Sequence, residues 1–230
     1  MERRILIVDD DPKLSEFVAR QLRGEGYSVD TAMDGQEGVD SAAARHPDLI
    51  LLDLSMPVMD GIEALTQLRE WYEGSIIILS ATDEEKKKVQ ALDLGADDYL
   101  TKPFGIQELF ARVRSAIRRA DKILASRDSD GAVVMAGDTR IDLSRRMVTR
   151  NGEEVSLTRT EYELLRALAT NVGKVMTHRE LLREVWGPEY GEETEYLRTF
   201  IKQLRRKLEP NPSRPVHLLT QPGLGYRLVV

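Results

Sequence analysis

Ile-Leu-Ile-Val-Asp-Asp-Asp (residues 5–11) is the stretch that decides the fold of the first half of the chain. Four consecutive apolar residues are typical of a strand buried on both faces, and the carboxylates begin where that strand should end. Residues 49–52 and 76–79 are similar apolar runs, and apolar residues at helical spacing lie between the runs, as over residues 14–22. Repeated units of strand and helix predict a parallel sheet covered by helices.

A second domain is predicted after a polar stretch. Residues 121–131 lose the apolar periodicity, which indicates a linker between a first domain at 1–120 and a second at 132–230. Asn151-Gly152 is a strong hairpin signal, and we expect three helices and a terminal β-hairpin after it. The strands predicted in this half are residues 133–135, 139–143, 147–150, 216–220 and 226–230.

The composition of the 230 residues excludes several kinds of site. The chain has no cysteine, which excludes disulfides, thiolate metal sites and cysteine nucleophiles. Its three histidines do not have metal-ligand spacing. No run of about 18 apolar residues is present, and the first residues lack the features of a signal peptide. We therefore expect a cytoplasmic protein without membrane contact, in which any metal is bound by oxygen ligands.

Charge divides the chain into two unlike halves. Residues 1–120 contain 15 Lys or Arg and 23 Asp or Glu, whereas residues 121–230 contain 18 and 16. The first half is therefore acidic and the second slightly basic. From Thr194 to the end there are seven basic and two acidic residues, which is typical of a nucleic-acid-binding surface.

Carboxylates follow two of the predicted strands. Asp9, Asp10 and Asp11 come directly after the first strand, and Asp53 directly follows the run at 49–52. Because ligands bind at the carboxyl ends of the strands in an open parallel sheet, these groups can converge. Crowded carboxylates repel one another, and Mg²⁺ is the oxygen-seeking cation that offsets this repulsion. A solvated acidic loop is the alternative interpretation of the cluster.

Two further strand ends supply groups that suit a phosphoryl ligand. The run at 76–79 ends at Ser80, which offers a hydroxyl, and the last strand of this half ends at Lys102, which offers a cation. A hydroxyl, a cation, a metal and a carboxylate together neutralise and position a phosphoryl group. With Asp53 as the nucleophile, the product would be an aspartyl phosphate.

The third helix of the second half, residues 194–208, has two unlike sides. An apolar stripe of four residues predicts its core side, and polar and basic residues lie opposite. Such a face is often only solvated, but two preceding helices with Thr caps at Thr158 and Thr177, and a hairpin behind, favour a recognition helix for the DNA major groove. The candidate DNA-binding residues are Arg198, Thr199, Lys202, Gln203, Arg205 and Arg206.

The first half resembles the receiver domains of two-component response regulators. The matching motifs are Ile-Val-Asp-Asp-Asp (7–11), Asp-Leu-Ser-Met-Pro-Val-Met-Asp-Gly (53–61), Leu-Ser-Ala (79–81) and Gly-Ala-Asp-Asp-Tyr-Leu-Thr-Lys-Pro-Phe (95–104). The resemblance implies a flavodoxin-like, doubly wound, five-stranded parallel sheet. It also implies that a sensor histidine kinase phosphorylates this domain and that Mg²⁺ is its cofactor.

The same resemblance implies a role for each site residue. Asp53 would accept the phosphoryl group, and Tyr99 would be an aromatic switch that follows the Ser80 hydroxyl inward. The Mg²⁺ ligands would be Asp10, Asp53 and the Ser55 carbonyl, with Asp9 acting through water, and Ser80 and Lys102 would hold the phosphoryl oxygens.

The second half resembles the winged helix-turn-helix effector domain of OmpR/PhoB-type regulators, an α+β fold. The matching motifs are Leu-Thr-Arg-Thr-Glu-Tyr-Glu-Leu-Leu (157–165), Arg-Glu-Leu-Leu-Arg-Glu-Val-Trp-Gly (179–187), Leu-Arg-Arg-Lys-Leu-Glu (204–209) and Gly-Leu-Gly-Tyr-Arg (223–227). By this likeness Thr199 and Gln203 would read bases in the tandem or repeated half-sites of a promoter, and Lys202 and Arg205 would contact phosphates. Gln203 stands where arginine is frequent, which favours adenine over guanine at that step. The wing carries Pro222 where a minor-groove arginine is often found.

Further partners are implied by the resemblance to this family. Residues 186–196 resemble the loop that touches RNA polymerase, although a plain connector is an equal alternative. Charged residues near the end of the first half resemble a receiver homodimer face formed on phosphorylation, with Lys88 facing Glu108, Asp97 facing Arg112 and Asp98 facing Arg119.

The prediction from the whole sequence is a DNA-binding transcription regulator whose receiver catalyses only its own phosphoryl transfer and is otherwise not an enzyme. Residues 102–109, 185–188 and 212–218 most resemble the Kdp-type subfamily, the potassium-response regulators. Two alternatives stay open. One is a Mg²⁺-dependent phosphatase that uses an aspartyl phosphate, against which stands Ser55 where such enzymes have a general acid. The other is a DNA-binding protein that works without phosphorylation.

Overall fold

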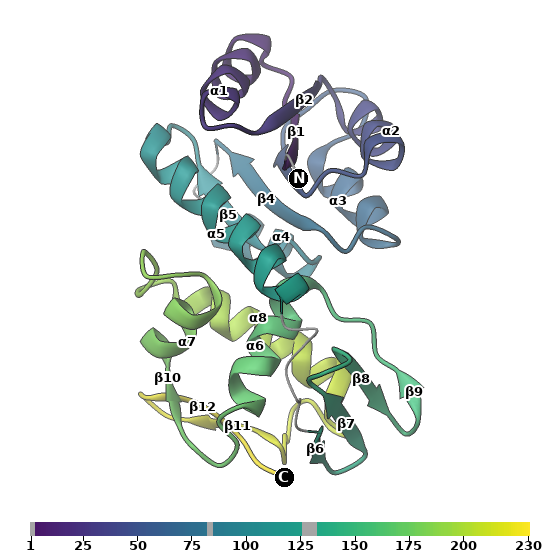
Figure 1. Cartoon of the computed structure of the whole chain (residues 1–230), viewed down its shortest axis with the longest axis vertical. Helices are drawn as coiled ribbons and strands as arrows, with labels where there is room; N and C mark the ends of the chain where they lie inside the picture. The colour runs from purple at the N-terminus through teal and green to yellow at the C-terminus, as the bar shows by residue number, and fades with distance from the viewer. Residues whose placement is uncertain (1–2, 82–84, 126–132) are drawn as a thin grey trace. The chain divides into compact units, whose positions relative to one another are not determined.

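The computed structural model describes residues 3–81, 85–125 and 133–230 of the chain (Figure 1). Two compact units are present, Met1–Ala120 and Asp121–Val230.

The first unit alternates strands with helices, as the apolar runs predict. Its sheet has the order β2-β1-β3-β4-β5 with every pair parallel, which confirms the predicted doubly wound architecture. The strands are β1 (Arg4–Val8), β2 (Ser28–Ala32), β3 (Leu49–Asp53), β4 (Ser75–Ser80) and β5 (Asp98–Thr101), and the helices are α1 (Pro12–Gly24), α2 (Gly35–Arg45), α3 (Gly61–Arg69), α4 (Glu85–Asp93) and α5 (Ile106–Ala125).

Helices cover both faces of this sheet (Figure 1). On one face, Ile5, Leu49 and Ile77 pack with buried residues of α1 and α5 in a single apolar cluster. The alternate residues of the same strands point the other way, and Val8 lies directly against Gly38 of α2. Burial on both faces explains why β1, β3 and β4 are apolar at nearly every position.

The loops at the carboxyl ends of the strands are held by helix caps and a close backbone approach. The side chains of Asp11 and Asp60 accept hydrogen bonds from backbone N–H groups in the first turns of α1 and α3. Gly61, the first residue of α3, lies against the backbone of β3. Only glycine fits at this position, because a Cβ would collide with the carbonyl oxygen of Asp53. These contacts bring the loop after β3 back over the end of the sheet.

The second unit consists of two antiparallel sheets and three helices. The sheets have the orders β6-β7-β8-β9 and β10-β12-β11. The strands are β6 (Val133–Ala136), β7 (Thr139–Asp142), β8 (Met147–Arg150), β9 (Glu153–Glu154), β10 (Met176–Thr177), β11 (Leu218–Gln221) and β12 (Gly225–Leu228), and the helices are α6 (Arg159–Ala169), α7 (His178–Val185) and α8 (Thr194–Leu208).

Capping boxes and an aromatic cluster define this unit. Thr158 with Glu161 and Thr177 with Glu180 form complete capping boxes at the starts of α6 and α7, as the sequence predicts. Trp186, which is fully buried, has its ring centroid 5.3 Å from that of Phe200 on α8. The aromatic contact anchors α8 to the end of α7.

The structure departs from the prediction in detail. The two-residue strands β9 and β10 were not predicted, because so short a segment has no periodicity. Helix α5 continues to Ala125, so the predicted linker at 121–131 begins as helix, and its remaining residues, 126–131, lie outside the described residues.

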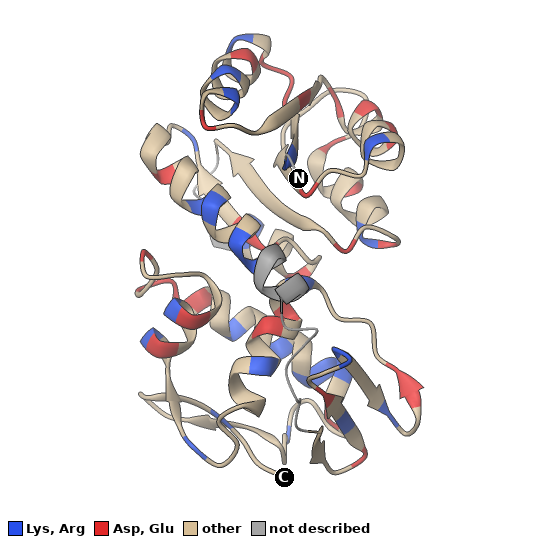
Figure 2. Cartoon of the chain, viewed as in Figure 1, with Lys and Arg blue, Asp and Glu red and all other residues tan. Residues whose placement is uncertain are grey.

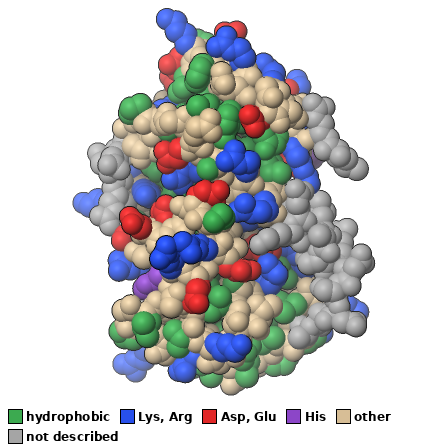
Figure 3. Space-filling view, turned by 60° about the vertical axis from the view of Figure 1, so that its left-hand side comes forward, with side chains coloured by type: hydrophobic (Ala, Val, Ile, Leu, Met, Phe, Trp, Pro, Cys, Tyr) green, Lys and Arg blue, Asp and Glu red, His purple; other side chains and the backbone are tan. Residues whose placement is uncertain are grey.

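No helix of the described residues is long and apolar enough to cross a membrane. The most exposed large hydrophobic side chain in the structure is Val58, at 85%. On the face drawn in Figure 3, hydrophobic side chains are interspersed with charged ones.

Candidate functional site

Three carboxylates meet at the carboxyl ends of β1 and β3, where the sequence predicts a cation site. One oxygen each from Asp9, Asp10 and Asp53 lies within 4.8 Å of the others. Asp9 and Asp53 are only 1% and 5% exposed, whereas Asp10 faces solvent. The parallel pairing of β1 with β3 produces this convergence, because both strands end at the same edge.

Lys102 provides the positive charge of this cluster. Its Nζ lies 2.7 Å from Oδ2 of Asp9 and 3.1 Å from Oδ2 of Asp53. The other oxygen of each carboxylate accepts a backbone N–H, from Asp11 at 3.0 Å and from Leu54 at 2.8 Å. One ammonium is therefore shared between two buried carboxylates, and a third carboxylate stands beside them.

Burial and charge oppose each other in the pKa values of this site. Burial raises the pKa of Asp53 above its ordinary 3.8, and the nearby Lys102 ammonium only partly offsets this. Burial lowers the pKa of Lys102, but its hydrogen bond to Asp9 and the charge of Asp53 outweigh that effect and leave it above 10.5. The site is therefore short of positive charge, and a cation would relieve the repulsion between its carboxylates.

The donor set fits a hard divalent cation. All three clustered groups offer oxygen, which Mg²⁺ prefers, and exposed Asp10 leaves room for water in the remaining positions. Ser55, whose carbonyl is the other predicted ligand, is exposed in the loop after β3.

Ser80 and Tyr99 lie on the neighbouring strands. Ser80 is the last residue of β4 and is 1% exposed, and its carbonyl accepts the Lys102 N–H at 2.7 Å. Tyr99 on β5 is 2% exposed, and the Lys88 Nζ lies 5.9 Å from its ring centroid. The backbones of Ser80 and Lys102 are therefore in direct contact at this edge of the sheet.

Three of the residues predicted for a homodimer face are already paired within one chain. Arg112 donates to Asp98 at 2.8 Å and to Glu108 at 2.9 Å. Arg119 is 2% exposed, and its Nη1 donates to Ser115 Oγ at 3.3 Å. The Nε and Nη2 of Arg119 have no hydrogen-bond partner among the described residues.

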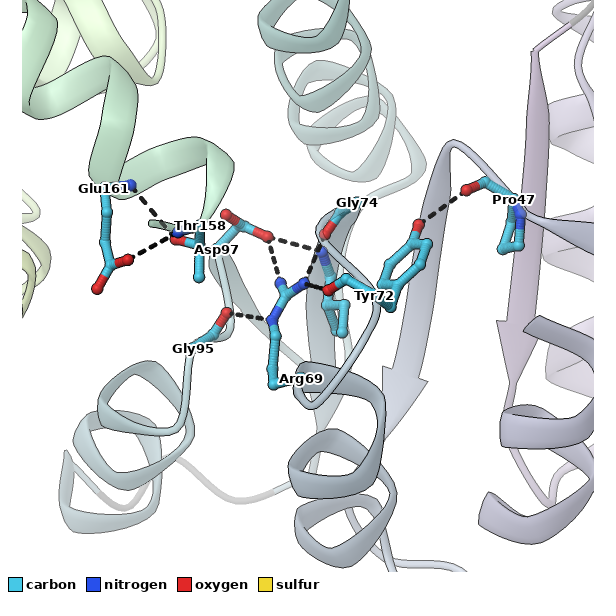
Figure 4. A network of polar contacts seen from close by, with 9 residues as sticks. Pro47, Arg69, Tyr72, Gly74, Gly95, Asp97, Thr158 and Glu161 are labelled. Atoms are coloured by element: carbon cyan, nitrogen blue, oxygen red, sulfur yellow. Dashed lines mark hydrogen bonds and ion pairs between the residues drawn. The ribbon is translucent and has the colours of Figure 1, made fainter. Parts of the chain in front are cut away.

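Asp97 has a partner that the sequence did not reveal, which is a correction to the predicted face (Figure 4). It is fully buried and accepts from Arg69 Nη2 at 2.7 Å and from the Ile76 N–H at 2.8 Å. Arg69 also donates to the carbonyls of Tyr72, Gly74 and Gly95. The network joins the end of α3 to the starts of β4 and β5, so Asp97 braces the sheet instead of facing outward.

The predicted DNA-reading face of α8 is only partly exposed. The exposed residues of this face are Arg198, Lys202 and Arg206, which are four residues apart. Figure 2 shows how the Lys and Arg residues are distributed along the chain. Thr199 and Gln203 are 5% and 6% exposed, contrary to a solvent-facing interpretation.

Two aromatic residues account for this difference. The predicted core stripe omitted Tyr196 and Phe200, which are buried as well and widen the apolar side of α8. At 100° per residue, Gln203 lies only about 20° from Tyr196 around the helix axis. Thr199 and Gln203 therefore stand at the edge of the buried side and not in the middle of the exposed one.

Arg205 braces the wing, which is a second correction on α8. Its Nε and Nη2 donate to the Leu218 carbonyl at 2.9 and 2.6 Å, and Nη2 also donates to Thr220 Oγ1 at 2.8 Å. Both acceptors are on β11. These bonds use three of the five N–H donors of the guanidinium, and the predicted phosphate contact of Arg205 stays a prediction.

The predicted polymerase-facing loop is anchored at both ends. Trp186 and Tyr196, the first and last residues of this stretch, are buried, as is Tyr190, while Glu189 and Glu192 are exposed. The loop therefore presents carboxylates on a fixed base.

Two family models match the chain, one in each unit. Residues 5–114 match the response regulator receiver domain, and residues 152–228 match the C-terminal domain of transcriptional regulatory proteins. The transcriptional regulatory protein KdpE of Mycobacterium tuberculosis is 46% identical over 223 residues, which is 97% of each chain. KdpE of Escherichia coli, the regulatory protein of the KDP operon, is 46% identical over 226 residues, 98% of this chain and 99% of that one.

Solved structures agree with these relatives. A mutant form of RitR superposes with a TM-score of 0.81 at 30% identity over 98% of both chains. The response regulator DrrB, a Thermotoga maritima OmpR/PhoB homologue, superposes with a TM-score of 0.53 at 29% identity over the full length of both. Together with the receiver sheet and the winged helix described above, these matches show that the chain belongs to the OmpR/PhoB-type family of two-component transcriptional response regulators.

Proposed function

We propose that the chain accepts a phosphoryl group on Asp53 from a sensor histidine kinase in the presence of Mg²⁺, and that this modification increases its binding to promoter DNA. The observation that carries the proposal is the position of Lys102 Nζ, within 3.1 Å of both Asp9 and Asp53 beside a third carboxylate. A cation that already bridges two carboxylates can hold a phosphoryl oxygen once one of them is phosphorylated.

Asp10, Asp53 and the Ser55 carbonyl would hold the metal, with Asp9 acting through water. Bound there, Mg²⁺ would supply positive charge that neutralises the carboxylates and the incoming phosphoryl oxygens. Asp53 attacks as the carboxylate, so the bond between phosphorus and the donor breaks as the bond to Asp53 forms. Lys102 and Ser80 hold the equatorial oxygens during this transfer.

The test is incubation of the full-length protein with phosphoramidate and MgCl₂, followed by intact-mass measurement. We expect a single added phosphoryl group that hydroxylamine removes, and no addition to Asp53→Asn or in the presence of EDTA. Labelling that persists in Asp53→Asn would move the site elsewhere. A matched control is Asp40→Asn, an exposed acid on α2.

We propose that Arg198, Lys202 and Arg206 contact DNA phosphates while Thr199 and Gln203 contact bases. The exposure of these three cations at four-residue spacing on α8 supports the phosphate contacts. The burial of Thr199 and Gln203 means that base contact requires a state in which both side chains are uncovered. Such a change of state is what phosphorylation would favour.

Gln203 is proposed to select adenine at one step of each half-site, because its amide can bond N6 and N7 of that base. Selection of binding sites from a random DNA library tests this. Gln203→Arg should shift the preferred base at one position of each half-site toward guanine, and an unchanged preference would refute the assignment.

We also propose that phosphorylation drives a receiver homodimer that involves Lys88, Asp98, Glu108, Arg112 and Arg119. Two donors of Arg119, Nε and Nη2, have no hydrogen-bond partner within the part of the chain that the structure describes, and they would suit a carboxylate of a second copy once this 2% exposed side chain is uncovered. Light scattering after size exclusion, with and without phosphodonor, measures the expected change from monomer to dimer. Arg119→Met should reduce the dimer fraction and leave Asp53 labelling unchanged.

Two partners are proposed from likeness alone. The acidic loop after α7 would touch RNA polymerase, a proposal that Glu189→Lys in a transcription assay tests separately from DNA binding. The 46% identity to KdpE supports a Kdp-type operon as the target. Footprinting across the genome with and without phosphodonor identifies the promoters directly.

A further inference from the structure

The hairpin formed by β11 and β12 ends in a tip without charge (Figure 1). From Pro215 to Tyr226 the chain contains no Lys, Arg, Asp or Glu. Leu218 and Leu228, which pair across the base of the hairpin, are only 2% and 1% exposed, whereas Leu224 at the tip is 57% exposed. The hairpin therefore closes its own apolar contacts without Leu224, and this side chain is available to a partner.

The backbone of the tip is fixed on both sides of Leu224. Its N–H donates to the Gln221 carbonyl at 3.0 Å, which closes a β-turn with Pro222 and Gly223 at the centre. Gly223 has a φ of 74°, as the third position of a type II turn requires. The Leu224 carbonyl accepts the His178 N–H at 3.0 Å from the start of α7. A backbone that is already ordered loses little conformational entropy when the tip binds.

The tip is attached to the proposed recognition helix. Arg205 of α8 donates to the Leu218 carbonyl and to the Thr220 hydroxyl of β11. On the other strand, a Cβ at Gly225 would collide with the Met176 carbonyl oxygen, so β12 lies close against β10. A hairpin attached to a helix in the major groove reaches across the neighbouring phosphate backbone, and the next groove is the minor one.

We propose that Leu224 enters the minor groove beside each half-site and packs between its sugar walls, where it supplies binding free energy that does not depend on salt. The inference rests on the proposed binding of DNA by α8. A single exposed leucine is common on protein surfaces, but apolar side chains such as leucine are also the ones that enter the minor groove as wedges. The tip has no acid that the phosphates would repel and no cation that would pair with them.

The first measurement compares variants of the full-length protein, treated with phosphodonor, on a site selected from the random DNA library. Leu224→Ala removes the contact, and Leu224→Met keeps an apolar side chain of similar size. Val216→Ala is the matched control, because Val216 is also 57% exposed but precedes β11, at the end of the hairpin away from the tip. Fluorescence anisotropy across a salt series gives the affinity and its salt dependence.

We expect Leu224→Ala to weaken binding by about three- to tenfold, the size expected when a few buried carbon atoms are removed. The slope of log K against log salt concentration should stay the same, because no ion pair is lost. Leu224→Met should keep most of the affinity, and Val216→Ala should bind as the wild type does. All variants should unfold at the same temperature, since both side chains are exposed. Equal effects of Leu224→Ala and Val216→Ala, or a changed slope in Leu224→Ala, would overturn the inference.

Modified bases test whether the contact is in the minor groove. Replacing adenine by 2,6-diaminopurine adds an amino group in the minor groove and leaves the major-groove edge unchanged. At one or two steps beside each half-site, this replacement should weaken binding of the wild type but not of Leu224→Ala, because the amino group occupies the space that Leu224 enters. Equal weakening of both proteins, or weakening of neither, would overturn the minor-groove contact. Absence of DNA binding by the wild-type protein would instead overturn the proposed function of α8.

Discussion

Two partly buried cations organise the first unit in different ways. Arg69 donates hydrogen bonds to three carbonyl oxygens and to Asp97, so its guanidinium serves contacts within the fold. Lys102 lies between Asp9 and Asp53, and there the acids outnumber the bases. A satisfied network stabilises one structure, whereas an unbalanced one has capacity for a ligand. The contrast indicates a structural role for the Arg69 charge and a ligand-binding role for the Lys102 charge.

Asp53→Asn should stabilise the metal-free protein at neutral pH. The folded state raises the Asp53 pKa above 3.8, so it binds the proton more tightly than the unfolded state does. Wild-type stability therefore falls as the pH rises from 3.8 through the raised value, and the neutral variant avoids this loss. We therefore expect the variant to have a higher free energy of unfolding than the wild type at pH 7.

Urea unfolding between pH 3 and pH 8 in EDTA measures this gain. Adding MgCl₂ should stabilise the wild type more than the variant, and Asp40→Asn should behave as the wild type throughout. A variant that is less stable than the wild type at pH 7 would contradict the charge imbalance.

Asp142 should titrate at unusually low pH. The Ser144 hydroxyl at 2.7 Å, then the Arg145 N–H and Arg140, lower its pKa to about 2. Because the folded value lies below the ordinary 3.8, its stabilising effect is complete above that pH and disappears as the pH falls through about 2. Carbon-13 NMR of the side-chain carboxyl measures the midpoint directly. Ser144→Ala should raise it, and a wild-type midpoint near 3.8 would show that the bonds do not form in solution.

Helix α8 combines three kinds of residue on one element. Leu197 and Phe200 hold it in the core, Arg205 ties it to the wing, and Arg198 and Arg206 are exposed. The core and wing contacts keep the helix rigid, which positions the exposed cations accurately for a charged backbone. Stability and binding should therefore be separable between adjacent residues.

Arg205→Ala should reduce stability, whereas Arg206→Ala should weaken DNA binding. Loss of Arg205 leaves the Leu218 carbonyl without its two side-chain donors, and we expect a stability loss of about 1–3 kcal/mol. Loss of exposed Arg206 should change stability by less than about 0.5 kcal/mol and weaken DNA binding. Thermal unfolding and a fluorescence anisotropy titration with promoter DNA test both variants. Equal stability losses would mean that the wing brace is not made.

At the scale of the whole chain, the two units differ in net charge. The first 120 residues have eight more acidic than basic residues, which suits a cation site, and the remainder has two more basic than acidic. The proposed phosphorylation of Asp53 would add negative charge to the acidic unit only, and it would change which state the chain occupies.

Salt dependence of DNA binding should reflect the number of copies bound. Phosphorylated protein should give a steeper plot of log K against log salt concentration than unphosphorylated protein, because the proposed homodimer brings the cations of two copies onto the DNA. Arg206→Ala should reduce the slope by about 1 for each copy bound. Fluorescence anisotropy across a salt series provides the measurement. Parallel plots for the two forms would contradict dimerisation on the DNA.

The apolar runs and the residues that follow them determined most of the first unit. Because each buried strand ends in a polar side chain, the order of the motifs alone placed Asp9, Asp53, Ser80 and Lys102 at one edge of the sheet, and the structure brings them together. Capping boxes at Thr158 and Thr177 likewise follow from short-range spacing. Such features depend on residues that are close together along the chain, so the sequence alone is sufficient to predict them.

Tertiary structure alone decided which charged groups are free to act. Helical or strand spacing predicts that Asp97, Arg205 and Gln203 are exposed. In the structure Asp97 pairs with Arg69, and Arg205 donates to the Leu218 carbonyl and the Thr220 hydroxyl. Gln203 is buried at the edge of the aromatic side of α8. These partners lie far away along the chain, and the distance between them is set by packing of whole elements. A pattern with a period of two or 3.6 residues contains no information about that distance. Only the packing of the folded chain therefore determines the partners of these residues.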